Sequence, residues 1–164
     1  MRIYVPSTFA LATEWLAAGT FSVERAYAVT EALTEWYEQG DEEELEYVAA
    51  SVAAKESLFL ISQESTDPTF RRVVLAFDVP ESLTGGEVEP RGGIAINGEL
   101  TFAELQSALI DGDDALTDVK SAATLMDRAS AGDGEAQFMV SQVEGHELLW
   151  FGPTEIEFVL QVDK

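Results

Sequence analysis

The sequence predicts an α+β fold in which a mixed sheet of about five strands carries helices mainly on one face. Three patterns indicate this class. Strand and helix patterns alternate in residues 2–40, a helical stripe covers 41–63, and a strongly apolar strand runs from 72 to 79. Because alternation of strands and helices is typical of crossover connections, part of the sheet is expected to be parallel.

The first forty residues predict two short strands, each followed by a helix. Apolar side chains alternate in residues 2–5, and residues 26–29 form the second short strand pattern. Helices are expected over 7–18 and 30–40, since each begins with a Ser or Thr N-cap and is followed by, or ends at, a glycine.

The long helix is the most clearly marked element. Asp41 is a good N-cap, and the three glutamates at 42–44 fall in the first turn, where the helix dipole favours negative charge. Apolar side chains recur at helical spacing to about Gln63, and the Asp-Pro pair at 67–68 breaks the pattern.

Residues 72–79 form the strongest strand pattern. Both faces are mostly apolar, which predicts a central strand that is covered on both sides. A loop with two adjacent glycines is expected over 81–91, followed by a short strand at 93–96 and an Asn-Gly turn.

In the last third of the chain, the boundaries between predicted helices and strands are less distinct. Thr101 and Glu104 match a capping box, so a helical turn followed by a strand is expected within 101–111, although the helix and strand alternatives both remain open there. Helices are then predicted from Asp113 or Asp114 onward and over 135–151. Alternation at 156–162 predicts a C-terminal strand, so 1–164 is expected to form one domain with 152–164 as an appended strand.

The charge of the chain is its strongest compositional feature. Lys and Arg number 9 against 31 Asp and Glu, for a formal net charge of -22 on 164 residues. Such a body repels phosphate backbones and anionic lipids, so direct binding of nucleic acid or membrane is disfavoured, and a basic protein is the expected partner if the acidity is functional. Adaptation of the composition to salt or to a GC-rich genome is the alternative.

Several classes of site are absent from the sequence. The chain has no cysteine, and we find no phosphate-binding loop or metal-ligand set, so no cofactor or metal is expected. The N-terminus does not resemble a signal peptide and no apolar run is long enough to span a bilayer, which predicts a cytoplasmic protein.

His146 is the only histidine, so any catalytic role for a histidine rests on it. Together with Glu147 it begins a pattern similar to the zinc motif H-E-x-x-H, but Trp150 stands where the second ligand would be. His146 and Glu147 are therefore retained only as weak catalytic candidates, and a hydrogen-bonded surface histidine is the simpler interpretation.

Two acidic clusters are candidate binding sites, one for calcium and one for a basic protein partner. Residues 111–118 resemble the start of a calcium loop, but Leu116 and Ala122 occupy positions that need Gly and Glu, so helix capping explains them better. The other cluster lies at the start of the long helix and is the candidate surface for a basic partner: Asp41, Glu42, Glu43, Glu44 and Glu46.

Aromatic residues and one basic turn are further candidates for a binding site. Arg91 with its two following glycines could surround an anion, but an arginine in so acidic a chain is more simply paired with a surface carboxylate. Five aromatic residues could line a pocket, although core packing is the commoner role of such residues: Trp15, Trp36, Tyr37, Trp150 and Phe151.

Several segments of the chain are similar to an uncharacterised actinobacterial family of small acidic proteins, known as a domain of unknown function. The likeness extends to about Phe151. It implies a small cytoplasmic protein from a GC-rich bacterium and implies no activity. The segments that carry it are 1–8 (MRIYVPST), 26–30 (AYAVT), 36–47 (WYEQGDEEELEY), 71–80 (RRVVLAFDVP), 133–138 (DGEAQF) and 145–150 (GHELLW).

Three functional classes follow. The first is a non-enzymatic protein that binds a basic protein partner through its acidic surface. The second is an enzyme or small-molecule binder with a pocket near His146, and the third is a nucleic-acid mimic whose carboxylates are spaced like phosphates.

Overall fold

The computed structural model describes residues 1–38 and 40–161. Its elements are β1 (Arg2–Ser7), α1 (Phe9–Ala18), β2 (Thr20–Ser22), β3 (Arg25–Tyr27), α2 (Glu31–Trp36), α3 (Glu42–Gln63), β4 (Val73–Asp78), η1 (Glu81–Leu83), β5 (Thr84–Val88), β6 (Gly93–Ile96), β7 (Glu99–Thr101), η2 (Phe102–Glu104), β8 (Leu105–Asp111), η3 (Asp113–Ala115), α4 (Leu116–Ser130), α5 (Gly134–Ser141), η4 (Gln142–Gly145), β9 (Leu148–Phe151) and α6 (Ile156–Val159), where η denotes a 3₁₀ helix.

The fold is α+β, as predicted, but the main sheet is larger than expected and is antiparallel. Its seven strands lie in the order β5-β6-β3-β1-β4-β8-β9, and each neighbouring pair is antiparallel. The expected parallel crossover does not form because β2, after α1, pairs with β7 in a separate two-stranded sheet. The chain then returns through β3, which lies antiparallel to β1 with Tyr4 opposite Tyr27.

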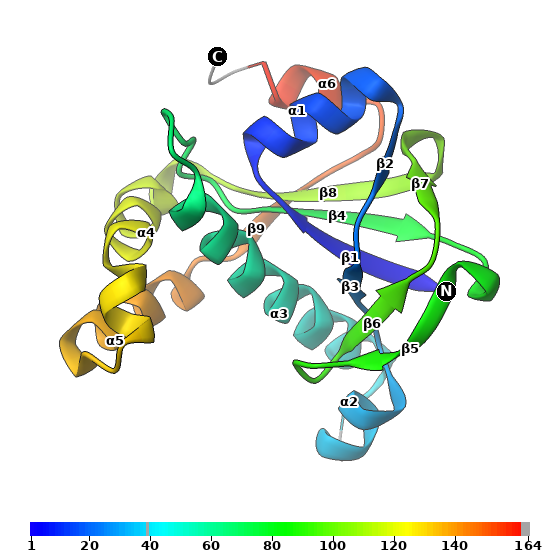
Figure 1. The fold of residues 1–164 in the computed structure, drawn as a ribbon, viewed down its shortest axis with the longest axis horizontal. Coiled ribbons are helices and arrows are strands. Elements are labelled where there is room, and N and C mark those ends of the chain that lie inside the picture. The colour runs from blue at the N-terminus through cyan, green and yellow to red at the C-terminus, as the bar shows by residue number, and fades with distance from the viewer. Residues whose placement is uncertain (39, 162–164) are drawn as a thin grey trace.

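Helices cover both faces of the sheet, which corrects the expectation that they pack mainly on one (Figure 1). Along β1, Ile3 and Val5 belong to one core cluster and Tyr4 to another. Helices α1 and α6 contribute to the Ile3 cluster, whereas α3 lies across the Tyr4 face. The double covering follows from β4, which is apolar on both faces as the sequence predicted, and whose residues 73–77 are fully buried.

A third core cluster lies beyond the edge of the sheet. Leu58 from α3, Val119 from α4 and Val143 from η4 are buried together there. This cluster holds the α4–α5 pair against the second half of α3, and it therefore positions the segment that leads into β9 (Figure 1).

The N-terminal half follows the predictions closely. Asp41 caps α3, since its Oδ1 accepts a hydrogen bond from the Glu44 amide at 2.9 Å, and α3 ends at Gln63 as expected. The N-cap of α1 is Thr8 rather than Ser7, because Ser7 still belongs to β1. Within the predicted loop 81–91, residues 84–88 form β5.

The C-terminal third departs further from the predictions. A helical turn followed by strand β8 is confirmed in 101–111. The helix predicted over 135–151 is wrong after Ser141, where the chain turns through η4 into β9. No helix in the described part of the chain is long and apolar enough to cross a membrane.

The predicted C-terminal strand is wrong in its described part, because residues 156–159 form α6. Ile156 and Leu160 are both buried, whereas Phe158 between them is 71% exposed. A spacing of four between buried residues is helical, and alternation of side chains in sequence was therefore a misleading signal. Residue 162 lies outside the described residues.

Candidate functional site

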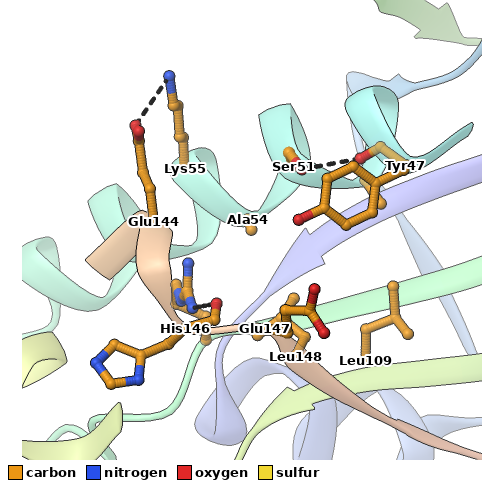
Figure 2. A pocket seen from close by; sticks show the side chains of 11 residues that line it. Tyr47, Ser51, Ala54, Lys55, Leu109, Glu144, His146, Glu147 and Leu148 are labelled. Carbon is orange, nitrogen blue, oxygen red and sulfur yellow. Dashed lines mark hydrogen bonds and ion pairs between the residues drawn. The ribbon is translucent and has the colours of Figure 1, made fainter. Parts of the chain in front are cut away.

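A cavity of about 520 Å³ lies between α3 and the segment that joins η4 to β9. Tyr47, Ser51 and Lys55 line it from α3, and Glu147 and Leu148 line it from the other side (Figure 2). Small-molecule sites in proteins typically have volumes of roughly 300–1,000 Å³. The size and position of this cavity make it the leading candidate for a functional site.

An arginine at the start of β4 belongs to the cavity lining and is held by a buried ion pair. The Nε of Arg72 donates to Oδ2 of Asp111 at 2.8 Å, and Nη2 donates to Oδ1 at 2.7 Å. The backbone amide of Arg72 also donates to Oδ2. Only 6% of the Arg72 side chain and none of the Asp111 side chain is exposed. This forked geometry fixes the plane of the guanidinium.

One side of the Arg72 guanidinium remains available. Nη2 makes a further bond to the carbonyl oxygen of His146 at 2.9 Å, but Nη1 makes none with residues 1–38 and 40–161. A guanidinium has five N–H donors, so the two on Nη1 are left for a ligand or water. An arginine that lines a cavity and keeps two donors without a partner among the described residues suits a carboxylate.

His146 contributes its backbone to the cavity rather than its ring. Figure 2 shows the imidazole turned away from Tyr47, Ser51 and Lys55. Its Nε2 lies 2.7 Å from Oδ2 of Asp118 on α4. The ring therefore ties the entry of β9 to α4, and the carbonyl of the same residue orients Arg72. His146 is a positioning residue in this arrangement.

The second catalytic candidate, Glu147, is exposed and lines the cavity. Its carboxylate forms no ion pair or hydrogen bond within the described part of the chain. At the opposite side, Lys55 and Glu144 pair at 3.2 Å, with 68% and 57% of their side chains exposed. Such an exposed pair opens readily, since its net stabilisation is typically about 0–1 kcal/mol. The cavity therefore presents both positive and negative groups to a ligand.

Three carboxylates of the calcium-like cluster each face a different side chain. Asp111 pairs with Arg72, Asp113 with Arg71 at 2.6 Å, and Asp118 with His146. No group of acidic or histidine side chains suited to a metal occurs among the described residues.

The acidic run at the start of α3 is on the surface. Asp41 and residues 42–44 are exposed and Glu46 is half-buried. None of these carboxylates forms an ion pair within 1–38 and 40–161. Tyr47 follows Glu46 directly and lines the cavity, so the run and the cavity belong to the same helix but the run is not part of the lining.

Sequence reasoning missed the pair of Arg72 and Asp111, which is the centre of the site. A signal existed, because Arg72 begins an otherwise apolar strand and Asp111 ends another predicted strand. Charged residues at the ends of buried strands are seldom left buried without a partner. Nothing in the sequence indicated that these two would be neighbours, since this depends on the pairing of β4 with β8.

Comparison with known proteins places the chain in a family. Residues 1–160 match the model of a family of unknown function (DUF6912), and the chain belongs to this family. No curated protein and no solved structure matches the chain. The arguments for function therefore come from the geometry of the site.

Proposed function

We propose that this protein is a non-catalytic binding protein that holds a small zwitterion, of the size of an amino acid or dipeptide, in the α3–β9 cavity. The observation that carries the proposal is the Arg72 side chain, which lines the cavity and is held in place by Asp111, while its Nη1 has no hydrogen-bond partner among the described residues. A ligand carboxylate would accept hydrogen bonds from Nη1 without any rearrangement of the arginine.

The charges around the cavity favour a zwitterion over a simple anion. A chain of net charge -22 repels anions from its surroundings, and Asp111 already neutralises Arg72. A ligand that carries an ammonium group as well avoids this repulsion. Glu147, which is exposed and unpaired among the described residues, supplies an acceptor for that group.

The side chains at the cavity support binding rather than catalysis. The His146 ring is occupied by Asp118, and the Ser51 hydroxyl donates to the Tyr47 carbonyl at 2.9 Å. A serine nucleophile needs a base within hydrogen-bond reach, and none is hydrogen-bonded to Ser51 among residues 1–38 and 40–161.

The test is a thermal-unfolding screen against the common free amino acids and glycyl dipeptides. A ligand that binds only the native state raises Tm in proportion to the logarithm of its concentration. Ala50→Leu, which fills the cavity from α3, should abolish the shift, and Gln63→Leu, on an exposed part of the same helix outside the lining, should leave it unchanged. A shift that persists in Ala50→Leu, or no shift with any compound, contradicts the proposal.

A basic protein partner is the second candidate function, and the exposed carboxylates of Asp41 and residues 42–44, which form no ion pair with the described residues, favour it. An oligolysine peptide should bind and be released as salt rises, because exposed charges are screened over about 8 Å at physiological ionic strength. Replacing residues 42–44 by Gln should weaken this binding more than a control of equal charge change elsewhere on the surface. The control substitutions are Asp114→Asn, Asp127→Asn and Glu157→Gln. Equal weakening by both sets contradicts a specific role of the helix start.

We also propose that the chain forms one domain, acts in the cytoplasm and belongs to an actinobacterial family of small acidic proteins. The absence of cysteine and the presence of only three lysines support this setting.

A further inference from the structure

A second cavity, of about 550 Å³, lies on the other side of α3, against α2 and the turn between β5 and β6. We propose that it is a separate binding site for a planar aromatic acid that carries a polar oxygen at the end opposite its carboxylate. The proposal rests on a buried phenol without a partner, on exposed aromatic side chains and on an arginine at the rim.

The phenol belongs to Tyr27 on β3, which lines the cavity and is fully buried. Its hydroxyl is the one buried side-chain oxygen or nitrogen in the described part of the chain that has no hydrogen-bond partner. A buried, unsatisfied polar group costs about 1–3 kcal/mol, and phenylalanine would fill the same space without that cost. The hydroxyl is therefore explained if a small shift of the cavity lining lets a ligand oxygen complete its hydrogen bond.

Aromatic side chains form the open part of the same cavity. Trp36 from α2 and Phe59 from α3 both line it, and they are 56% and 42% exposed. Exposed aromatic side chains that meet at a cavity mark binding sites more often than accidental exposure. Their flat faces suit a planar ring.

The rim carries a cation without a carboxylate partner. Arg91 lies over the Trp36 ring, with its Cζ 4.7 Å from the ring centroid, and forms no ion pair with the described residues. It lines the cavity and is available to a carboxylate.

The frame of the cavity is fixed by another arginine. Arg25 donates to the Glu89 carbonyl at 2.7 Å and pairs with Glu56 of α3 at 3.3 Å. Its Cζ also lies 5.7 Å from the Tyr27 ring centroid. These contacts join the β5–β6 turn to α3, so the two walls of the cavity keep their positions without a ligand.

The groups that line the cavity specify the ligand. The Tyr27 hydroxyl suits an oxygen, Arg91 suits an anion, and the aromatic side chains of the same lining suit a flat apolar body. This site does not include Arg72, so it is independent of the function proposed for the first cavity. Ser51 and Lys55 border both cavities and are left unchanged in the test.

The probe is 6-hydroxy-2-naphthoate, whose fluorescence reports binding to the intact protein. We expect saturable binding with quenching of tryptophan emission. Tyr27→Phe, which removes one hydrogen bond, should weaken it about five- to tenfold. Arg91→Gln should weaken it by at least as much, because a charged partner is lost. Tyr37→Phe, an exposed tyrosine outside the lining, is the control and should have no effect.

Three results overturn the proposal. The first is the absence of saturable binding to the unaltered protein. The second is unchanged affinity in either Tyr27→Phe or Arg91→Gln, because the proposal requires both side chains. The third is a loss of affinity in the Tyr37→Phe control that equals the loss in Tyr27→Phe.

Discussion

The two cavities that flank α3 share one helix and differ in how their polar groups are satisfied. On the β9 side, the buried Arg72 is neutralised by Asp111 and held by His146, and it keeps one nitrogen without a partner among the described residues. On the α2 side, the buried polar group is the neutral Tyr27 hydroxyl, which has no partner there.

Burial has different consequences for a charged side chain and for a neutral hydroxyl. A charge cannot be buried alone, so the β9 cavity needs Asp111 even without a ligand. A neutral hydroxyl can be left unsatisfied at a modest cost, so the α2 cavity folds with its hydrogen bond unmade. Replacing Asp111 should therefore lower the free energy of unfolding strongly, whereas replacing Tyr27 by phenylalanine should raise it slightly.

The largest effect is expected from Asp111→Ala. It leaves the Arg72 guanidinium buried without its counter-charge, and the free energy of unfolding should fall by about 3–5 kcal/mol. Urea denaturation measures it. In the control Asp113→Ala, whose carboxylate is 86% exposed, the loss should stay below about 1 kcal/mol. Equal losses in both variants would remove the distinction between the buried carboxylate of Asp111 and the exposed carboxylate of Asp113.

A smaller effect is expected from His146→Ala, which removes the tie between β9 and α4. The ring and Asp118 are partly exposed, so the loss should be about 1 kcal/mol. A double-mutant cycle with Asp118→Asn should show that most of the loss is shared by the pair. Additive effects of the two substitutions would mean that the 2.7 Å contact does not stabilise the fold.

Tyr27→Phe should raise the free energy of unfolding at neutral pH by about 1 kcal/mol, the lower end of the cost of an unsatisfied buried polar group. Burial raises the pKa of the Tyr27 hydroxyl above its ordinary value of 10.0. Because the folded-state pKa is the higher one, this tyrosine contributes stability that is present below pH 10 and is lost as the pH rises toward the folded-state pKa. Tyr27→Phe should reduce this alkaline loss, and unfolding curves against pH measure it. An unchanged alkaline slope would contradict the burial argument.

The smallest effect is expected away from both cavities, at the surface pair of Arg2 and Asp78, whose atoms lie 2.6 Å apart. The hydrogen bond from Arg2 lowers the pKa of the Asp78 carboxyl. The pair therefore contributes stability above the unfolded-state pKa and loses it as the pH falls through the lower folded-state pKa. Asp78→Asn should cost at most about 0.5 kcal/mol at neutral pH and nothing in strong acid. A larger loss would mean that exposed pairs matter in this chain, and the contrast with Asp111 would weaken.

The parts of the fold that local patterns control were predictable. The N-cap at Asp41, the length of α3 and the doubly covered strand β4 all follow from residues close together in sequence. The strand β9 was not predictable, because its four residues follow a helical pattern and become a strand only by pairing with β8. The same dependence on distant pairing hid the contact between Arg72 and Asp111.

The sequence named His146 as a candidate, and the structure places this residue in the lining of the β9-side cavity. Its ring contacts Asp118 and its carbonyl contacts Arg72, and neither contact could be read from the sequence. Trp36, which was considered a core residue, is 56% exposed because α2 is short and ends at the surface beside the second cavity. Exposure of this kind depends on how helices dock, which side-chain spacing alone does not determine.

The binding group proposed for the β9-side cavity is Nη1 of Arg72. The most direct measurement is side-chain ¹⁵N NMR of the arginines while the strongest amino acid or dipeptide from the thermal screen is added. We predict a saturable shift of the Arg72 Nη resonances, with no change at the surface residues Arg2 and Arg128. Resonances of Arg72 that stay unchanged at saturation, or a parallel shift of all arginines, would contradict the account.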